Sequence, residues 1–290
     1  MANWYGYILV IIAAAIFGAS SIIAKYVYFT GLSPVPVLIM QGLLAMVIAW
    51  GWVIVSGKWV AIPKSLIFSL MTQGIIGSFL TTVLFYSALG SMSASLVTLL
   101  FFTYPAFVLI YNVLLNGHQV TRAEKVALVM ASVGLVFCVD LPKIGLGEVD
   151  VWAAMMAVGA AITNAYLIIN GEKLLEKISL PVVTAWTQTI SLVMLLVIYQ
   201  PLWLVSISLS WYQVGLLAAG GIMNLLPLMI YLAGIRRVGA GIASIVSTAE
   251  IPFTLILAWV LLGETLNGMQ TVGGLLIMLS VVILYCYRIE

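Results

Sequence analysis

The chain has 290 residues, of which 64% are hydrophobic and only 7% are charged, and its formal net charge is +2. Ordinary soluble domains carry about 25% charged residues, so this composition is typical of an integral membrane protein and excludes a water-soluble domain. The small and scattered net charge gives no indication of nucleic-acid binding.

Hydrophobic segments follow one another along the whole chain, each close to the roughly 20 residues that a helix needs to cross a bilayer. Charges, Gly/Pro clusters and polar turns separate them, which predicts an all-α integral membrane protein with ten transmembrane helices. The predicted spans are 5–24, 36–55, 66–89, 94–115, 123–139, 151–170, 182–199, 211–235, 240–262 and 269–287. The first segment has neither a basic start nor a small-residue cleavage site, so we interpret it as a retained span.

The basic residues indicate the orientation of these spans. With the N-terminus in the cytoplasm, only Lys25 and Lys143 fall on the outer side. The inner side then holds Lys58, Lys64, Arg122, Lys125, Lys173, Lys177, Arg236, Arg237 and Arg288. Because cytoplasmic loops are enriched in Lys and Arg, this bias predicts a multi-pass protein of the cytoplasmic membrane with both termini inside.

The two halves of the chain resemble each other when it is shifted by 146 residues. The stretch 31–45 then falls on 177–191, and Gly117 falls on Gly263, while Pro105 and Pro252 are 147 residues apart. Five spans are an odd number, so the second copy must enter the membrane from the opposite face. The sequence therefore predicts two inverted five-helix repeats, residues 1–145 and 146–290, an architecture common among secondary transporters.

The second half ends in AWVLLGETLNGMQTVGGLLIMLSVVIL (258–284), preceded by Glu250 and Pro252. This pattern resembles the ending of transporters in the EamA family of the drug/metabolite transporter superfamily. The stretch 95–121 resembles the same pattern but has His118 where the family has a glutamate. The resemblance implies a ten-helix, exporter-like fold in which helices one to four and six to nine line a central cavity. Helices five and ten are then expected outside it.

Glu250 stands out because it lies inside a predicted span. Arg237 lies 13 residues before it and Glu264 lies 14 residues after it. At 1.5 Å per residue each separation is about 20 Å, so Glu250 is expected near the midplane of the bilayer. Ionisable residues at this depth usually serve transport, so a place in or beside a transport path is one interpretation. The other is a protonated glutamate that a neighbouring helix holds for packing alone.

Three prolines are candidate helix breaks near such a site: Pro105, Pro227 and Pro252. Each removes one helical N–H and displaces the carbonyl four residues earlier. Freed carbonyls at membrane depth are tolerated only where they are buried in protein or face water. The matched positions of Pro105 and Pro252 in the two repeats favour a cavity at the midplane, although each proline alone is equally compatible with an ordinary kink.

Several polar and aromatic residues fall within spans that would surround this cavity. With Glu250, the candidate substrate- and proton-binding residues are Gln41, Asn164, Gln188, Tyr104, Trp186 and Asn224. Gln41 and Gln188 occupy nearly equivalent positions in helices two and seven. Each amide is compatible with a substrate contact or with an interhelical hydrogen bond, since either one satisfies it.

The sequence therefore predicts a secondary transporter, of the exporter type, that moves small metabolites such as amino acids or related amines by alternating access. Protons are the candidate coupling ion, and the expected assembly is a monomer or a homodimer. A channel or sensor is the alternative, although no charge ring, filter or output domain is visible. A membrane enzyme is less favoured because one buried acid and one loop histidine do not supply a catalytic set. Cys138 and Cys286 lack metal-ligand spacing, so we expect no metal site and no cofactor.

Overall fold

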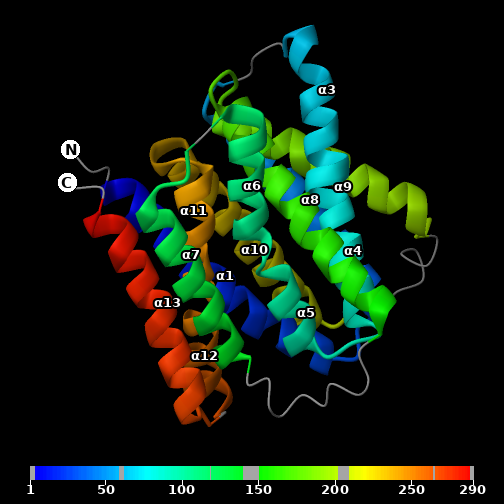
Figure 1. Cartoon of the computed structure of the whole chain (residues 1–290). Coiled ribbons are helices and arrows are strands. Elements are labelled where there is room, and N and C mark those ends of the chain that lie inside the picture. Colours follow the sequence, from blue (N-terminus) through cyan, green and yellow to red (C-terminus); the bar gives the residue numbers. More distant parts are fainter. Residues whose placement is uncertain are drawn as a thin grey trace.

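The computed structural model describes residues 4–58, 62–117, 119–139, 150–201, 209–263 and 265–287, and all regular structure in these ranges is helical (Figure 1). The first half contains α1 (Trp4–Phe29), α2 (Pro34–Val55), α3 (Lys64–Thr72), η1 (Gln73–Leu80), α4 (Thr81–Leu89), α5 (Ala94–Phe101), α6 (Tyr104–Asn116) and α7 (Arg122–Cys138). The second half contains α8 (Val151–Leu175), α9 (Leu180–Tyr199), α10 (Trp211–Val238), α11 (Ala240–Val246), η5 (Ser247–Ala249), α12 (Glu250–Leu262) and α13 (Gly268–Cys286).

Several of these elements join into single spans. The pieces α3, η1 and α4 are continuous, and so are α11, η5 and α12, while α5 and α6 are separated by two residues. In the described ranges nine helices are long and apolar enough to cross a membrane, and α7, with 17 residues, completes ten. The prediction of an all-α membrane protein with ten helices is confirmed.

Local signals set the helix ends in both repeats in the same way. Pro34 and Pro181 lie in the first turns of α2 and α9, where a missing N–H does no harm. Gly117 and Gly263 follow α6 and α12 with φ of 63° and 68°, a left-handed conformation that glycine adopts without strain. Corresponding helices of the two repeats therefore begin with a proline and end at a glycine in the same way.

Small residues bring α1 and α10 into close contact at the centre of the molecule. A Cβ atom placed on Gly234 would lie 2.6 Å from Val10 Cγ2, and one placed on Gly6 would lie 2.6 Å from Val238 Cγ1. These contacts join the start of α1 to the end of α10. Because real Cβ atoms do not approach so closely, only glycine permits this helix separation.

Helices α7 and α13 form a separate pair beside the other helices (Figure 1). A Cβ atom placed on Gly273 would lie 2.5 Å from the carbonyl oxygen of Gly134 and 2.7 Å from the amide nitrogen of Cys138. The thiol of Cys138 lies 3.8 Å from the carbonyl oxygen of Gln270, in the first turn of α13. The two helices are therefore antiparallel, and Cys286 lies at the far end of α13 from Cys138.

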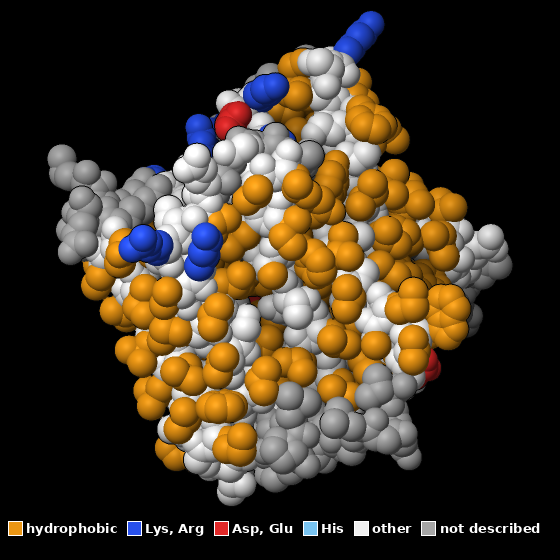
Figure 2. All heavy atoms as spheres, in the orientation of Figure 1, with side chains coloured by type: hydrophobic (Ala, Val, Ile, Leu, Met, Phe, Trp, Pro, Cys, Tyr) orange, Lys and Arg blue, Asp and Glu red, His pale blue; other side chains and the backbone are white. Residues whose placement is uncertain are grey.

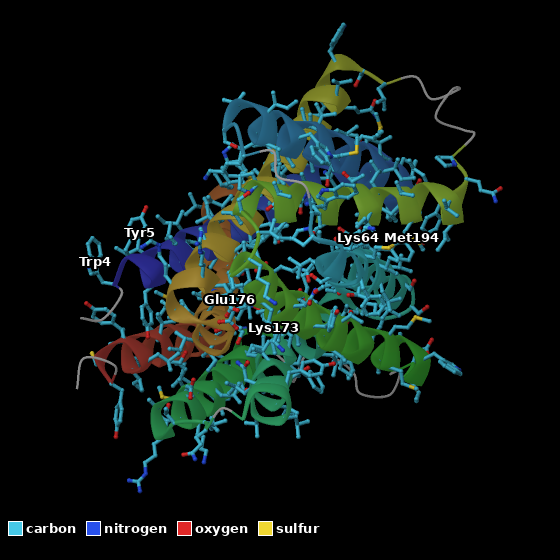
Figure 3. The ribbon with its side chains drawn as sticks, turned by 90° about the horizontal axis from the view of Figure 1, so that it is seen from above. Trp4, Tyr5, Lys64, Lys173, Glu176 and Met194 are labelled. Carbon is cyan, nitrogen blue, oxygen red and sulfur yellow. The ribbon has the colours of Figure 1, made fainter. Side chains whose placement is uncertain are left out.

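The described basic residues gather at one end of the bundle. Since successive helices cross in opposite directions, eight basic residues come together at this end: Lys58, Lys64, Arg122, Lys125, Lys173, Lys177, Arg236 and Arg237. Figure 2 shows Lys and Arg side chains at the top and on the left side of the molecule, with a largely apolar surface elsewhere, and Figure 3 views the molecule from above with Lys64 and Lys173 labelled. His118, Lys143, Glu264, Arg288 and the side chain of Lys25 lie outside the described residues.

Substitution of Gly273 tests the α7–α13 contact. We expect Gly273→Ala to lower the free energy of unfolding by about 1–3 kcal/mol, because the new methyl group meets rigid backbone of α7. Gly268→Ala, in the same helix, is the matched control because nothing lies within 4 Å of a Cβ atom placed there. Thermal unfolding of the two variants in detergent measures the difference, and equal melting temperatures would contradict the close contact.

Topology reporters test the orientation of the spans. A reporter that is active only outside the cytoplasm should work when fused after Lys143 and fail after Lys58 or Arg237, because the latter two belong to the basic end. The amount of each fusion in the membrane fraction is measured, and fusions that do not insert are left out of the comparison. Reporter activity after Arg237 would exclude the inverted arrangement.

Candidate functional site

Two cavities lie between the helices, and they share the lining residues Phe17 of α1 and Leu228 of α10. The first, which we call the Glu250 cavity, has a volume of about 200 Å³. The second, the amide cavity, has a volume of about 230 Å³. Their walls come from every span except α7 and α13, as the resemblance to EamA transporters implied.

The Glu250 cavity lies where two spans are interrupted. Helix α5 ends at Phe101 and α6 begins at Tyr104, while in the second repeat a short 3₁₀ turn over residues 247–249 precedes α12, which begins at Glu250. Pro105 and Pro252 follow these interruptions in the first turns of α6 and α12. The predicted matched breaks are therefore present, and they bring Tyr104 and Glu250 to the same cavity.

The helix break that the sequence predicts at Pro227 is not found in the structure. Helix α10 runs without interruption from Trp211 to Val238, and Pro227 is buried inside it. Proline removes a single hydrogen bond of the helical ladder. Helix α2 packs against α10 before Pro227, at Gly220 and Gly221, and α1 packs against it after Pro227, at Gly234, so the loss of this one bond does not end the helix.

A hydrogen bond joins the two interrupted spans. The hydroxyl groups of Tyr104 and Ser247 are 2.6 Å apart, and Ser247 Oγ donates to the carbonyl oxygen of Ser244 at 2.9 Å. Because the serine proton is used in that second bond, the tyrosine O–H donates to Ser247. One partner comes from each repeat, so this bond connects the two halves of the protein at the cavity wall.

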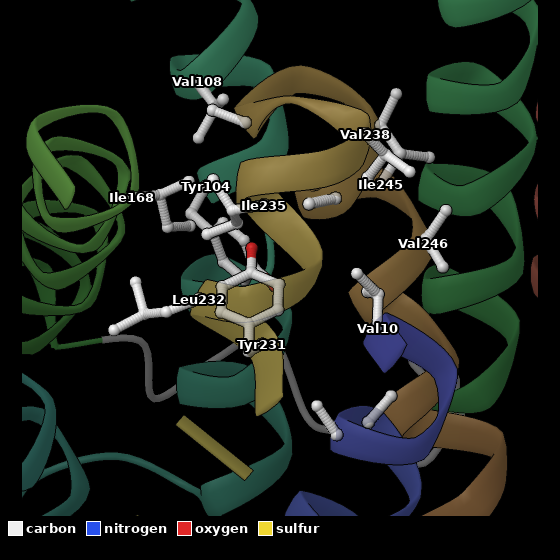
Figure 4. Packing of buried hydrophobic residues seen from close by; sticks show 14 of the residues in the cluster. Val10, Tyr104, Val108, Ile168, Tyr231, Leu232, Ile235, Val238, Ile245 and Val246 are labelled. Atoms are coloured by element: carbon white, nitrogen blue, oxygen red, sulfur yellow. The ribbon is translucent and has the colours of Figure 1, made fainter. Parts of the chain in front are cut away.

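Other polar groups on the Glu250 cavity lack partners. Within the described part of the chain, neither the Glu250 carboxyl nor the Asn164 amide makes a side-chain hydrogen bond or an ion pair, although both line the cavity. The hydroxyl of Tyr231 is buried without a hydrogen-bond partner among the described residues, and its ring lies beside Tyr104 and Leu232 (Figure 4). Buried polar groups normally have partners, so these three groups are suited to bind a polar ligand.

The amide cavity brings together three of the predicted residues. Asn224 Nδ2 donates to Gln41 Oε1 at 3.1 Å and to the carbonyl oxygen of Gly220 at 2.8 Å. Gln41 and Asn224 are thus tied to each other across α2 and α10. Gln188 lines the same cavity and makes no side-chain hydrogen bond within the described residues, which leaves its amide available to a ligand.

Trp186 lines neither cavity. Its ring packs edge-on against Trp50 of α2, with 5.6 Å between the ring centroids. Trp50 Nε1 in turn donates to Thr189 Oγ1 at 2.8 Å. The structure therefore places Trp186 in the contact between α2 and α9 and not on the wall of either cavity.

Sequence reasoning missed the π-helix η1 and its contacts with α8. Gln73 Nε2 donates to the carbonyl oxygen of Leu167 at 3.0 Å, and Asn170 Nδ2 donates to Gln73 Oε1 at 2.8 Å. These bonds fix the part of α8 that carries Asn164. A polar residue followed by Gly74 and Gly77 within one span is a usable signal, because π-bulges are frequent at functional sites. Ser247 carries no comparable signal.

Two other carboxylates near helix ends, those of Glu172 and Glu124, have hydrogen-bond partners, unlike Glu250. Glu172 Oε1 accepts a hydrogen bond of 3.0 Å from the amide nitrogen of Ala240, at the start of α11. Glu124 is buried and forms a capping box with Thr121, whose amide nitrogen donates to Glu124 Oε2 at 2.7 Å. Among the described residues, no group of three or more His, Cys, Asp or Glu side chains is placed to hold a metal ion.

Comparisons with known proteins agree with this architecture. The model of the EamA-like transporter family matches the chain twice, over residues 4–139 and 151–286. The chain is 24% identical over 285 residues to the Uncharacterized transporter YcbK of Bacillus subtilis (strain 168), with 92% of this chain and 88% of that protein covered. One solved protein crystal structure, 13% identical in sequence, superposes with a TM-score of 0.81 over 96% of this chain and 97% of that chain, and has the same fold.

Cysteine accessibility tests the two cavities. In a background carrying Cys138→Ala and Cys286→Ser, we expect Asn164→Cys and Gln188→Cys to react with a small water-soluble thiol reagent, because both positions line cavities. Gln41→Cys should react more slowly, because Gln41 is buried against Gly220 and Asn224.

Buried neighbours on the same helices provide the controls for this experiment. Ala165→Cys on α8 and Thr184→Cys on α9 should stay unmodified, since both positions are fully buried. Labelling is measured by mass spectrometry of the intact protein in membranes. If the cavity positions were as inert as these two controls, water would not reach the cavities.

Proposed function

Because the chain belongs to the EamA-like transporter family, we propose that it is a secondary exporter of small metabolites such as amino acids or related amines, working by alternating access. We place both termini in the cytoplasm and the protein in the cytoplasmic membrane. The observation that supports this most directly is the Glu250 carboxyl, which lines a cavity between the two repeats and has no partner within the described residues.

Burial makes the charged form of a carboxyl unfavourable unless a positive group accompanies it. The described residues that share the cavity with Glu250 include Tyr104, Asn164, Tyr231 and Ser247, none of which is positively charged. A cation must therefore come from outside the protein. Either a proton or the ammonium group of a substrate fills this role, so Glu250 binds a substrate amine, a proton, or the two in alternation.

The contact between the repeats offers a means of alternating access. Tyr104 of the first repeat and Ser247 of the second are hydrogen-bonded at the cavity wall, next to the interrupted backbone of α5–α6 and α11–α12. Interrupted helices move more readily than continuous ones, because fewer backbone bonds must break. Movement of one repeat against the other then exposes the Glu250 cavity to the two sides of the membrane in turn.

Substitution of Glu250 tests this mechanism. We expect Glu250→Gln to fold and insert normally, because glutamine keeps the size of the side chain. Its rate of proton-driven transport should fall at least about tenfold, because an amide does not ionise. Proteoliposomes under imposed proton gradients, screened with labelled amino acids and amines, measure the rate across a range of pH. The residual transport of the variant should change little with pH.

The control for that assay is Glu176→Gln, which removes an exposed carboxylate at the end of α8 and should leave transport unchanged. If Glu250→Gln transported like the wild type at every pH, the carboxylate would have a structural role only.

A further inference from the structure

The charges on the two cavities narrow the substrate class. Among the described residues that line them, Glu250 is the only acidic one, and none is Lys, Arg or His. A carboxylate on a substrate would therefore find no basic side chain beside it. An unpaired charge at membrane depth is strongly unfavourable. The lack of a basic side chain among the described lining residues therefore disfavours substrates that carry a carboxylate.

Helix N-termini are the other groups that bind carboxylates inside membrane proteins. Two helices, α6 and α12, begin at the Glu250 cavity, but their first turns offer few free donors. Pro105 and Pro252 have no N–H, and the N–H groups of Thr103, Ala106 and Glu250 already donate to backbone carbonyls. The Glu250 carboxyl itself lies at the start of α12 and repels a second carboxylate.

The same cavity suits a positive charge. Phe17, Phe101, Tyr104 and Tyr231 line it together with Glu250. The rings of Phe101 and Tyr104 lie side by side, with centroids 5.5 Å apart. Aromatic rings attract ammonium groups through their π-electrons, and this attraction is strongest where water is excluded. A carboxylate with several aromatic neighbours is thus a site for an organic ammonium ion.

The neighbouring amide cavity suits an uncharged polar group. Gln188, Thr82 and Ser191 line it with donors and acceptors that carry no net charge. The two cavities have volumes of about 200 and 230 Å³ and meet at Phe17 and Leu228, whose side chains line both. A substrate that reaches past these two side chains would have its ammonium group in the Glu250 cavity and a neutral polar group in the amide cavity.

We propose that this site selects organic cations without a carboxylate, such as aryl-alkylamines and amino-acid amides, and discriminates against zwitterionic amino acids. The inference rests on the proposed function, since it takes the Glu250 cavity as the transport site. It narrows that function from amino acids and amines in general to amines that carry a net positive charge.

Three probes test the inference, and they differ only in the substituent on the carbon that bears the ammonium group. Phenylalanine has a carboxylate there, phenylalaninamide an uncharged carboxamide and phenethylamine a hydrogen atom. We expect the amide and the amine to bind the purified full-length protein at least about tenfold more tightly than phenylalanine, measured by equilibrium dialysis with radiolabelled ligand in detergent. Glu250→Gln should weaken the binding of both cations at least about tenfold, whereas Glu176→Gln should not. Competition for uptake into proteoliposomes should follow the same order.

The outcomes separate this inference from the proposed function. If phenylalanine binds as tightly as its amide and Glu250→Gln weakens both, the selectivity is overturned while Glu250 remains the binding group. If neither cation binds the wild type, or if both bind Glu250→Gln as well as the wild type, the inference and the role of Glu250 are overturned together.

Discussion

The hydrocarbon interior of a bilayer forms no hydrogen bonds, so each polar group within it needs a partner inside the protein. The helices satisfy the backbone, and most polar side chains are satisfied as well. Gln73 and Asn170 bond each other across two spans, and Thr81 bonds Thr163 at 2.7 Å. Against this background the Glu250 carboxyl, which has no partner among the described residues, is the ionisable exception, and it is the group best suited to bind a ligand.

The fold was predictable because its signals are local. Hydropathy marks each span without knowledge of its neighbours, and an odd number of spans per repeat dictates the inversion. The matched breaks at Pro105 and Pro252 were also predictable, because proline removes a hydrogen bond wherever it lies in a helix. Pro227 shows the limit of this reasoning, since the packing around α10 decides whether one lost bond ends a helix.

The candidate site was less predictable, because an amide within a span is satisfied equally by a ligand or by another helix. Gln41 and Gln188 occupy nearly equivalent places in the two repeats, yet Gln41 bonds Asn224 whereas Gln188 faces a cavity without a partner in the described chain. Ser247 is an ordinary residue for a membrane helix. Only the packing of η5 brings its hydroxyl group to the wall of the Glu250 cavity.

The repeats share the interruption of their fourth helix but differ in charge at the cavity. When the two repeats are aligned in sequence so that Pro105 matches Pro252, Thr103 falls at the position of Glu250. Only the second repeat therefore supplies a carboxylate. A single carboxylate pairs with one positive charge at a time. Under the proposed mechanism a proton and a substrate cation therefore compete for Glu250, and the exchange of one for the other moves no net charge. It follows that a pH difference drives such transport, and that the membrane potential adds no driving force to it.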